Sequence, residues 1–335
     1  MGIRVVITGG AGFLGAMLAR RLLAGPLAVG GAEPADVDEL LLVDIVEPPS
    51  DLVADTRVRA VVGDLHAVLD GGGDTGGIGE VDAVFHLAGV VSGAAEADFD
   101  LGMRTNLDAT RALLEWTRRH RVPPVLVFTS SLAVFGSDPA IGPLGVVDDD
   151  TLPRPQSSYG VQKFIGEQLV ADYTRKGFLR GRSVRLMTVS VRPGRPNAAA
   201  SSFLSGIVRE PLAGQRAVCP VPADTPVALS SPRRTMDGIL CAASVDDATW
   251  GSRTAMNLPA LSTTPAEMVG ALARVAGPET ADLIDWTDDP TIAPIVRSWP
   301  AVLRTPRAEG LGLVPEESFD DIVRAYLADN PRPGA

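Results

Sequence analysis

Tyr159 and Lys163 lie four residues apart, a spacing that brings two side chains together on one face of a helix. An ammonium group beside a phenol favours the phenolate, which can act as a base. A tyrosine with an unperturbed pKa of roughly 10 is a poor base at neutral pH, so a lysine neighbour would have to lower that pKa. The same spacing also arises by chance on many helices, and the rest of the chain must decide between these interpretations.

The segment before this pair predicts how the phenol is held. Pro153 and Pro155 come shortly before Ser157 and Ser158, and serine is a favoured residue at the N-cap of a helix. We therefore expect a helix that begins at one of these serines, with Tyr159 in its first turn.

The N-terminal segment predicts a strand, a glycine turn and a helix. The β-branched run Ile3 to Thr8 leads into glycines at positions 9, 12 and 15, and apolar residues at helical spacing follow. Such glycines permit a tight turn, a close approach of the backbone to a pyrophosphate, and close packing of helix on strand. We predict a dinucleotide site here, the alternative being a glycine-rich loop without a ligand. Its expected contacts are Gly9, Gly12, Phe13, Leu14 and Gly15.

Asp44 ends a second predicted strand, Glu39 to Asp44. A carboxylate at this place accepts hydrogen bonds from a ribose diol and repels a 2′-phosphate, which favours NAD over NADP. The spacing from Gly15 exceeds the usual ~20 residues, and we attribute the excess to a Gly/Pro/Ala-rich insertion, Gly25 to Asp38. The alternative for Asp44 is an ordinary turn residue at a strand end.

Further strand ends supply small or polar residues that could contact the same cofactor. Predicted strands cover Val58 to Val62 and Val81 to Leu87, and a long amphipathic helix covers Asp98 to His120 with Asn106 facing inward. A buried amide must be hydrogen-bonded, and this one could brace the strand ends. The additional cofactor contacts that we expect are Asp64 (at the adenine), Leu65, Leu87, Ala88, Gly89 and Asn106.

The order of elements predicts a doubly wound parallel sheet of the Rossmann type with a smaller C-terminal substrate-binding lobe. Val125 to Thr129 brings Ser130 and Ser131 to the carboxyl edge of the sheet, where ligands of such folds bind. A sixth strand is expected over Val184 to Val191. We assign residues 1–192 to the cofactor domain, with a return segment near 232–258, and 193–335 mainly to the lobe. Helices are expected over Met236 to Ser244, Pro265 to Ala276 and Phe319 to Leu327.

Composition narrows the classes of partner and compartment. The chain of 335 residues carries 41 acidic and 30 basic residues, and its formal charge of −11 disfavours nucleic acid and anionic membranes. Cys219 and Cys241 form neither a disulfide framework nor a metal-ligand spacing, and the three histidines are scattered, so no metal site is predicted. The absence of a leader pattern or an apolar run of membrane length favours a cytoplasmic location.

The glycine turn, Ser131 at the end of the fifth strand, and Tyr159 with Lys163 on the next helix occur in an order that resembles the extended short-chain dehydrogenase/reductases, a part of the NAD-dependent epimerase/dehydratase family. The resemblance covers the whole chain, including Gly63 to Leu65, Leu87 to Gly89 and Thr129 to Gly136. It selects Ser131 over Ser130 as the catalytic serine. A narrower likeness, to the D-erythronate dehydrogenases, lies in Val90 to Asp100, Val189 to Phe203 and Ile207 to Gln215.

This resemblance implies an NAD-dependent dehydrogenase that oxidises the C2 hydroxyl of D-erythronate, a four-carbon sugar acid, to 2-dehydro-D-erythronate. Tyr159 as phenolate would take the hydroxyl proton while hydride leaves the same carbon for the nicotinamide. Ser131 would hold the oxygen. Lys163 would lower the pKa of Tyr159 and hydrogen-bond the nicotinamide ribose.

A sugar acid also needs a partner for its carboxylate, and the planar fork of arginine suits that role. Arg233 is the first choice, because related enzymes that act on nucleotide sugars carry a phosphate-binding arginine there, and Arg192 is the second; either could instead form a structural ion pair. The other expected substrate contacts are Ser92, Ser131, Asn197 and Ser201. The resemblance also implies a homodimer, built through the helices at 98–120 and 157–176.

Two other functions remain open at this level. A nucleotide-sugar epimerase or dehydratase would keep its NAD tightly bound and form no net NADH. A non-catalytic NAD sensor would not need Ser131, Tyr159 and Lys163, which makes it the weaker alternative.

Overall fold

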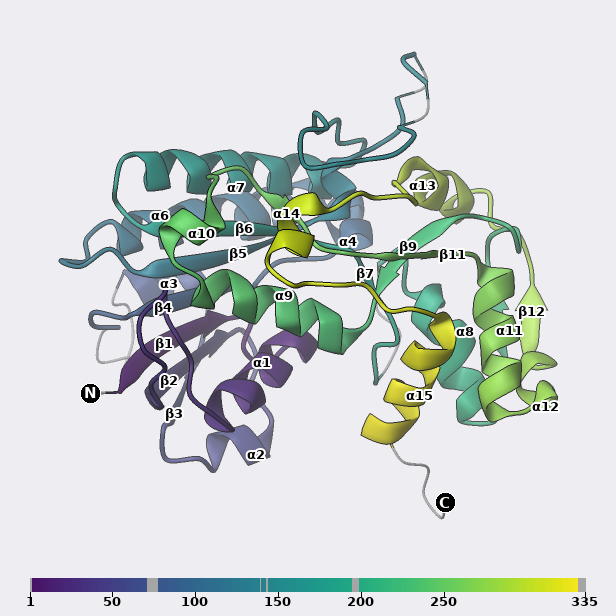
Figure 1. Ribbon diagram of the computed structural model, residues 1–335, viewed down its shortest axis with the longest axis horizontal. Helices are drawn as coiled ribbons and strands as arrows, with labels where there is room; N and C mark the ends of the chain where they lie inside the picture. The colour runs from purple at the N-terminus through teal and green to yellow at the C-terminus, as the bar shows by residue number, and fades with distance from the viewer. Residues whose placement is uncertain (1, 71–77, 139, 143, 195–198, 331–335) are drawn as a thin grey trace.

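The computed structural model describes residues 2–70, 78–138, 140–142, 144–194 and 199–330. A seven-stranded sheet with the order β10-β6-β5-β4-β1-β2-β3 forms its centre (Figure 1), and every pairing within it is parallel. The predicted doubly wound α/β fold is thus confirmed. The strands are β1 (Ile3–Thr8), β2 (Val37–Asp44), β3 (Val58–Val62), β4 (Ala83–His86), β5 (Val125–Ser131), β6 (Arg180–Leu186) and β10 (Met256–Asn257).

Alternating residues of the strands supply two separate apolar cores, one on each face of the sheet. Val5 and Ile7 pack with one set of helices, whereas Val6 between them packs with the other. The first face carries α1 (Phe13–Leu23), α9 (Pro232–Ser244) and α14 (Pro306–Gly310), and the second carries α3 (Leu65–Leu69), α6 (Ala109–Thr117) and α7 (Ser158–Arg175). This continuous burial on both faces is what a parallel sheet requires.

The sixth strand differs from its prediction at both ends. It begins at Arg180 instead of Val184, and after Leu186 the chain leaves the large sheet. The next residues form β7 (Thr188–Val189), which joins a three-stranded sheet with β9 (Val227–Ser230) and β11 (Leu261–Thr263). The start of β6 is not evident in the sequence, because buried strands usually lack charge and this one carries arginines at 180, 182 and 185. In the structure, Arg182 pairs with Asp247 and Arg185 pairs with Glu167.

The long helix predicted over Asp98 to His120 is divided into shorter pieces. The Asp98 side chain accepts a hydrogen bond from Leu101 N at 2.9 Å and so starts a new helix. The pieces after α4 (Ser92–Ala97) are α5 (Phe99–Gly102), a π-helical turn η1 (Met103–Asp108) and α6. The wide turn of η1 contains Asn106, and such turns are frequent at functional sites.

A smaller lobe with its own apolar core lies beside the large sheet (Figure 1). Its helix α11 (Pro265–Ala276) has the predicted bounds. The lobe also holds α8 (Phe203–Leu212), α12 (Pro278–Ala281), α13 (Ile292–Ser298), α15 (Phe319–Asp329), and the parallel pair β8 (Ala217–Cys219) and β12 (Ile284–Trp286). The remaining short helices are α2 (Ser50–Val53), η2 (Leu132–Val134) and α10 (Asp247–Trp250).

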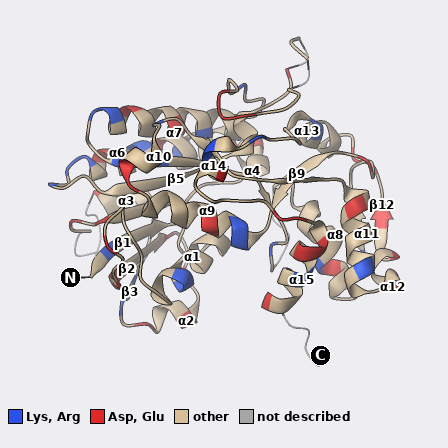
Figure 2. Ribbon diagram, in the orientation of Figure 1, with Lys and Arg blue, Asp and Glu red and all other residues tan. Residues whose placement is uncertain are grey.

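Charged residues lie mainly on the helices and loops around the sheet (Figure 2). The acidic loop at 148–150 makes specific contacts with the rest of the fold. Asp149 accepts hydrogen bonds from Asn257 N at 3.2 Å and Arg307 N at 3.3 Å, and so ties the loop to β10 and α14. Among the described helices, none has the length and apolar character needed to cross a membrane.

Candidate active site

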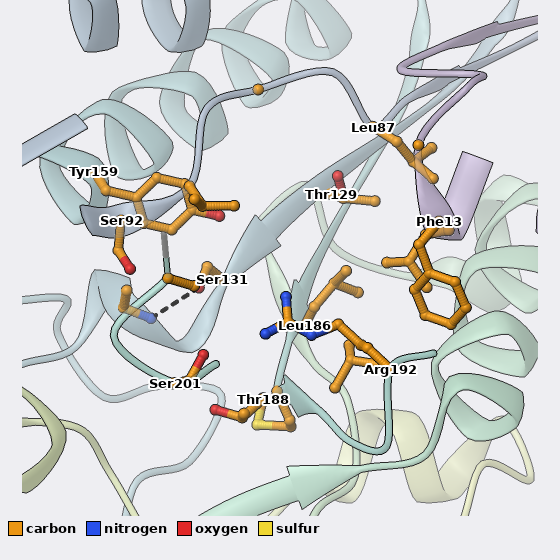
Figure 3. Close-up of a pocket in the computed structure, with 18 of the residues that line it drawn as sticks. Phe13, Leu87, Ser92, Thr129, Ser131, Tyr159, Leu186, Thr188, Arg192 and Ser201 are labelled. Carbon is orange, nitrogen blue, oxygen red and sulfur yellow. Dashed lines mark hydrogen bonds between the residues drawn. The ribbon is translucent and has the colours of Figure 1, made fainter. Parts of the chain in front are cut away.

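A cavity of about 380 Å³ lies where the glycine turn, the ends of β4 and β5, the start of α7 and the chain after β6 meet (Figure 3). This is the carboxyl edge of the parallel sheet, the usual place for ligands in such folds. The predicted site residues that line it are Gly9, Gly12, Phe13, Leu14, Gly15, Leu87, Gly89, Ser92, Ser131, Tyr159, Lys163, Arg192 and Ser201.

Two positions of the glycine turn, Gly9 and Gly15, require glycine. Gly9 has φ +73°, and a Cβ on Gly15 would lie 2.1 Å from the Gly9 carbonyl oxygen. Gly12 caps α1 without a side-chain hydrogen bond, so the first N–H groups of that helix remain available to an anion. Across the cavity, a Cβ on Gly89 would come within 2.8 Å of Asn106 Oδ1 and 3.5 Å of Lys163 Nζ. This bare backbone fits a dinucleotide pyrophosphate.

Asp44 lies at the end of β2, next to this turn. Its two carboxylate oxygens accept hydrogen bonds from Ala11 N at 3.0 Å and Ile45 N at 2.7 Å, which hold the side chain at the turn. Asp64 instead caps α3, where its Oδ1 accepts from His66 N at 2.9 Å. Leu65 is buried in the core between the sheet and helices α3, α6 and α7. Asp44, Asp64, Leu65 and Ala88 do not line the cavity.

The first turn of α7 brings Tyr159 to the cavity. Ser157 is the N-cap, and its hydroxyl accepts a hydrogen bond from Gly160 N at 3.2 Å, so the predicted helix start is confirmed. Figure 3 shows Tyr159, Ser92 and Ser131 on one side of the cavity. The Ser131 hydroxyl accepts from Ala133 N at 3.1 Å, an interaction that fixes its position at the strand end.

Lys163 lies one turn further along α7 and is almost fully buried. Its ammonium donates to the Thr129 carbonyl at 3.0 Å and lies 5.8 Å from the centroid of the Tyr159 ring. Burial lowers the pKa of Lys163 to about 8, and the charge of Glu167 opposes that change. The ammonium is therefore held close to the phenol at a pKa near the physiological range.

Burial acts against the lowering of the Tyr159 pKa that we expect from Lys163. Burial raises the pKa of the phenol above its ordinary value, and a hydrogen bond with Ser131 opposes the rise only in part. Desolvation penalises the charged phenolate more than the polar neighbours stabilise it.

Asn106 braces the loop after β4, as its inward position predicts. The amide is buried; its Oδ1 accepts from Val90 N at 2.9 Å, and its Nδ2 donates to Val90 O at 3.2 Å and Gln162 Oε1 at 2.8 Å. The residue does not line the cavity itself, and acts on it through Val90 and α7.

His86 is a buried residue of β4. Its ring nitrogens lie 2.6 Å from Thr8 Oγ1 and 2.9 Å from Thr110 Oγ1, and burial lowers its pKa to about 3. A neutral ring in this network links the strand before the glycine turn to the helix that follows Asn106.

Two arginines face the cavity from the lobe side. Figure 3 shows the Arg192 side chain pointing into the cavity. Arg209 Nη1 donates to the Arg192 carbonyl at 2.8 Å, and burial together with the charge of Arg209 lowers the pKa of Arg192. Arg209 also pairs with Glu210, whereas no ion pair joins Arg192 to any acid in the described part of the chain. This end of the cavity can therefore receive an anion.

The structure does not bring Arg233 to the cavity. Its side chain is 53% exposed at the start of α9, and its Nε donates to Asp329 Oδ2 on α15 at 3.0 Å. The residue is used to join two helices on the surface, the structural alternative that the sequence left open. Asn197, another expected substrate contact, falls outside the described residues.

Arg209 and Trp299 are among the cavity residues that the predicted set did not contain. Arg209 lies in the apolar stretch of α8, and a charged residue among buried neighbours is a signal that could have identified it. Trp299 follows α13 and packs against the apolar cluster of Leu132, Met187 and Ala228. Nothing local in the sequence indicates that this tryptophan reaches the cavity, because its position depends on how the lobe docks.

The chain is similar in sequence to known proteins over nearly its whole length. The sequence model of the NAD dependent epimerase/dehydratase family matches residues 5–227. The D-erythronate dehydrogenase of Cupriavidus necator is 52% identical over 330 residues, which cover 98% of each chain. The D-erythronate dehydrogenase of Haemophilus influenzae is 39% identical, over 97% of this chain and 99% of the relative.

Among solved structures, the nucleoside-diphosphate-sugar epimerase from Agrobacterium tumefaciens has a TM-score of 0.85 at 36% identity, over 98% of this chain and 94% of the other. The L-threonine 3-dehydrogenase of Trypanosoma brucei has a TM-score of 0.81 at 23% identity, over 99% and 98% of the two chains, a likeness of fold alone.

Proposed function

The chain belongs to the NAD dependent epimerase/dehydratase family, and on that premise we propose that it oxidises the C2 hydroxyl of D-erythronate to 2-dehydro-D-erythronate with NAD. One observation carries the substrate assignment. A single cavity has Tyr159 and Ser131 on one side and the Arg192 guanidinium pointing into it (Figure 3). A base and a cation that share so small a space suit an acid with its reacting carbon close to the carboxylate.

The residues around the glycine turn would hold the cofactor, which supplies a hydride acceptor when it is bound. Gly9, Gly12 and Gly15 admit the pyrophosphate, and the N-terminus of α1 favours its charge. Asp44 would receive the ribose diol and reject a 2′-phosphate. Turnover with NADP equal to that with NAD would contradict this role of Asp44.

Tyr159 would take the C2 hydroxyl proton as a phenolate. Ser131 would hold that oxygen in place, which contributes orientation more than proton transfer. Because burial raises the pKa of Tyr159, the phenolate needs positive charge nearby, and Lys163 is the cation that α7 places one turn away. Lys163 would also hydrogen-bond the nicotinamide ribose.

Arg192 would bind the substrate carboxylate in place of Arg233. Its fork can make two parallel hydrogen bonds to a carboxylate, and burial strengthens such bonds. Arg209 holds the backbone of Arg192 and adds positive charge behind it. Ser92 and Ser201, which both line the cavity, are candidates for the remaining hydroxyls.

The experiment that tests this function is a panel of aldonic and other 2-hydroxy acids assayed for NADH formation. We expect D-erythronate to give the highest kcat/KM. An epimerase acting on nucleotide sugars is the second candidate, because the nucleoside-diphosphate-sugar epimerase from Agrobacterium tumefaciens matches nearly the whole chain. Tightly bound NAD after purification together with no net NADH from any acid would favour the epimerase.

The proposal extends to organisation and location. Residues 1–192 with the return segment 232–258 would bind the cofactor, and most of 193–335 would bind substrate. We also propose that the protein is cytoplasmic.

We further propose that the protein is a homodimer. Exposed apolar side chains on α5 and α7, among them Phe99, Val161 and Ile165, support a dimer face there. A molar mass equal to one chain in light scattering would contradict the dimer.

A further inference from the structure

A buried ion pair lies behind the candidate catalytic residues. Arg185 Nε and Nη2 donate to the two carboxylate oxygens of Glu167 at 2.9 and 2.8 Å. The side chains are only 5% and 1% exposed, so both charges are removed from water. Removing two charges from water is costly, and a buried pair is often no more stable than apolar residues of the same volume. Stability alone therefore gives no reason for this pair.

Its position on α7 connects it to the site. Glu167 follows Lys163 by four residues, so the two lie on the same face of the helix. The hydroxyl of Ser130 donates to Glu167 Oε1 at 2.5 Å. Ser130 stands between Thr129, whose carbonyl accepts from the Lys163 ammonium, and Ser131. One carboxylate thus holds the end of β5 against the helix that carries Tyr159 and Lys163.

The groups that face Lys163 leave Glu167 as its source of negative charge. On β4, His86 is neutral because burial lowers its pKa to about 3, and on β5 Thr129 offers a carbonyl. On α7 the neighbours are Tyr159, a neutral phenol, and Glu167. Arg185 on β6 is a cation that pairs with the same carboxylate, and it supplies no negative charge. In the described part of the chain, Glu167 is the charge that opposes loss of the Lys163 proton by burial.

We propose that Glu167 is a positioning residue, which keeps Lys163 charged during the reaction and holds the end of β5 in register with α7. Arg185 keeps the carboxylate in place, and is itself held by Asn257 Oδ1 at 3.4 Å and by the Phe135 ring, 4.7 Å from the guanidinium. The inference rests on the proposed dehydrogenase function, because it uses the protonated lysine of that reaction.

The test is the pH profile of kcat for D-erythronate oxidation by Glu167→Gln. The amide keeps the size of the side chain and removes its charge. We expect the alkaline limb, where Lys163 loses its proton, to move to lower pH by about one unit or more, the usual size of an effect from a nearby opposite charge. The KM for the acid should stay close to that of the wild type, since Arg192 is untouched. An alkaline limb at the wild-type pH would overturn the proposal.

Asp247→Asn is the matched control. It leaves Arg182, a second buried arginine of β6, without its partner at the start of the same strand. We expect lower thermal stability and an unchanged pH profile. A limb displaced as far as in Glu167→Gln would mean that any unpaired arginine in β6 disturbs the site, and would overturn the proposal.

A double variant, Glu167→Met with Arg185→Met, covers the case in which Glu167→Gln does not fold. Apolar residues of similar volume replace a buried pair with little loss of stability. The limb should remain displaced, because Glu167 is the partner whose charge acts on Lys163. An alkaline limb of the kcat profile at the wild-type pH in this double variant would overturn the proposal. A wild-type enzyme that oxidises no sugar acid would instead contradict the proposed function, so the two failures are distinguishable.

Discussion

The two walls of the cavity are built in different ways. The cofactor wall is made by short segments that fold on themselves, as where Gly9 turns with φ +73° and Gly15 packs against it. The substrate wall is made by segments that meet only in the folded chain, as where Arg209 donates a hydrogen bond to the Arg192 carbonyl and Trp299 packs against the cluster that contains Met187. Under the proposed function, cofactor binding is therefore set locally, whereas substrate choice depends on how the lobe docks.

The largest effect is expected at Tyr159, where the two walls face each other. Tyr159→Phe removes the phenol and keeps the ring, so kcat should fall by about 10²- to 10⁴-fold, the scale for a positioned base. NAD affinity, followed by quenching of tryptophan fluorescence, should hardly change. Unchanged oxidation of D-erythronate by this variant would show that the base lies elsewhere.

The substrate wall is tested by Arg192→Met. Loss of a charged hydrogen-bonding partner costs about 1.5–3 kcal/mol, which corresponds to roughly a 10- to 100-fold rise in the KM for D-erythronate. The KM for NAD should stay the same if the walls are independent. Equal rises in both constants would show that the lobe also controls cofactor binding, and the comparison would fail.

The cofactor wall is tested by Gly15→Ala. The added Cβ would lie 2.1 Å from the Gly9 carbonyl oxygen, so the turn must distort. Such overpacking costs about 1–3 kcal/mol, and we expect NAD to bind roughly 5- to 150-fold more weakly. Gly25→Ala is the control, because no atom lies within 4 Å of the Cβ built there. Equal losses from both changes would contradict a specific role for the turn.

Regular local patterns allowed much of the fold to be predicted. The strands at 3–8 and 58–62 and the helix at 265–276 have the expected bounds, because their apolar periodicity is undisturbed. The start of β6 was missed since its arginines find partners on α7 and α10, elements that are distant in sequence. The break before β7 was missed because strand propensity continues across it.

The site residues show the same division between features set by local sequence and features set by contacts between distant segments. The glycine turn, Ser131, Tyr159 and Lys163 were identified from motifs, and the structure brings them to one cavity. The direction of the Tyr159 pKa could not be predicted, because it depends on burial by segments remote in sequence. The same holds for the choice among arginines. The sequence shows where the arginines are. It does not show that Arg233 pairs with Asp329 while Arg192 lines the cavity.

The smallest effect is expected from Arg233→Met, which tests that choice directly. The ion pair between Arg233 and Asp329 is about half exposed, and such pairs contribute less than about 1 kcal/mol, so thermal unfolding should change little. Because the side chain lies outside the cavity, the KM for D-erythronate should equal that of the wild type. A rise as large as that from Arg192→Met would mean that α9 moves toward the cavity when substrate binds, and that the carboxylate is shared between the two arginines.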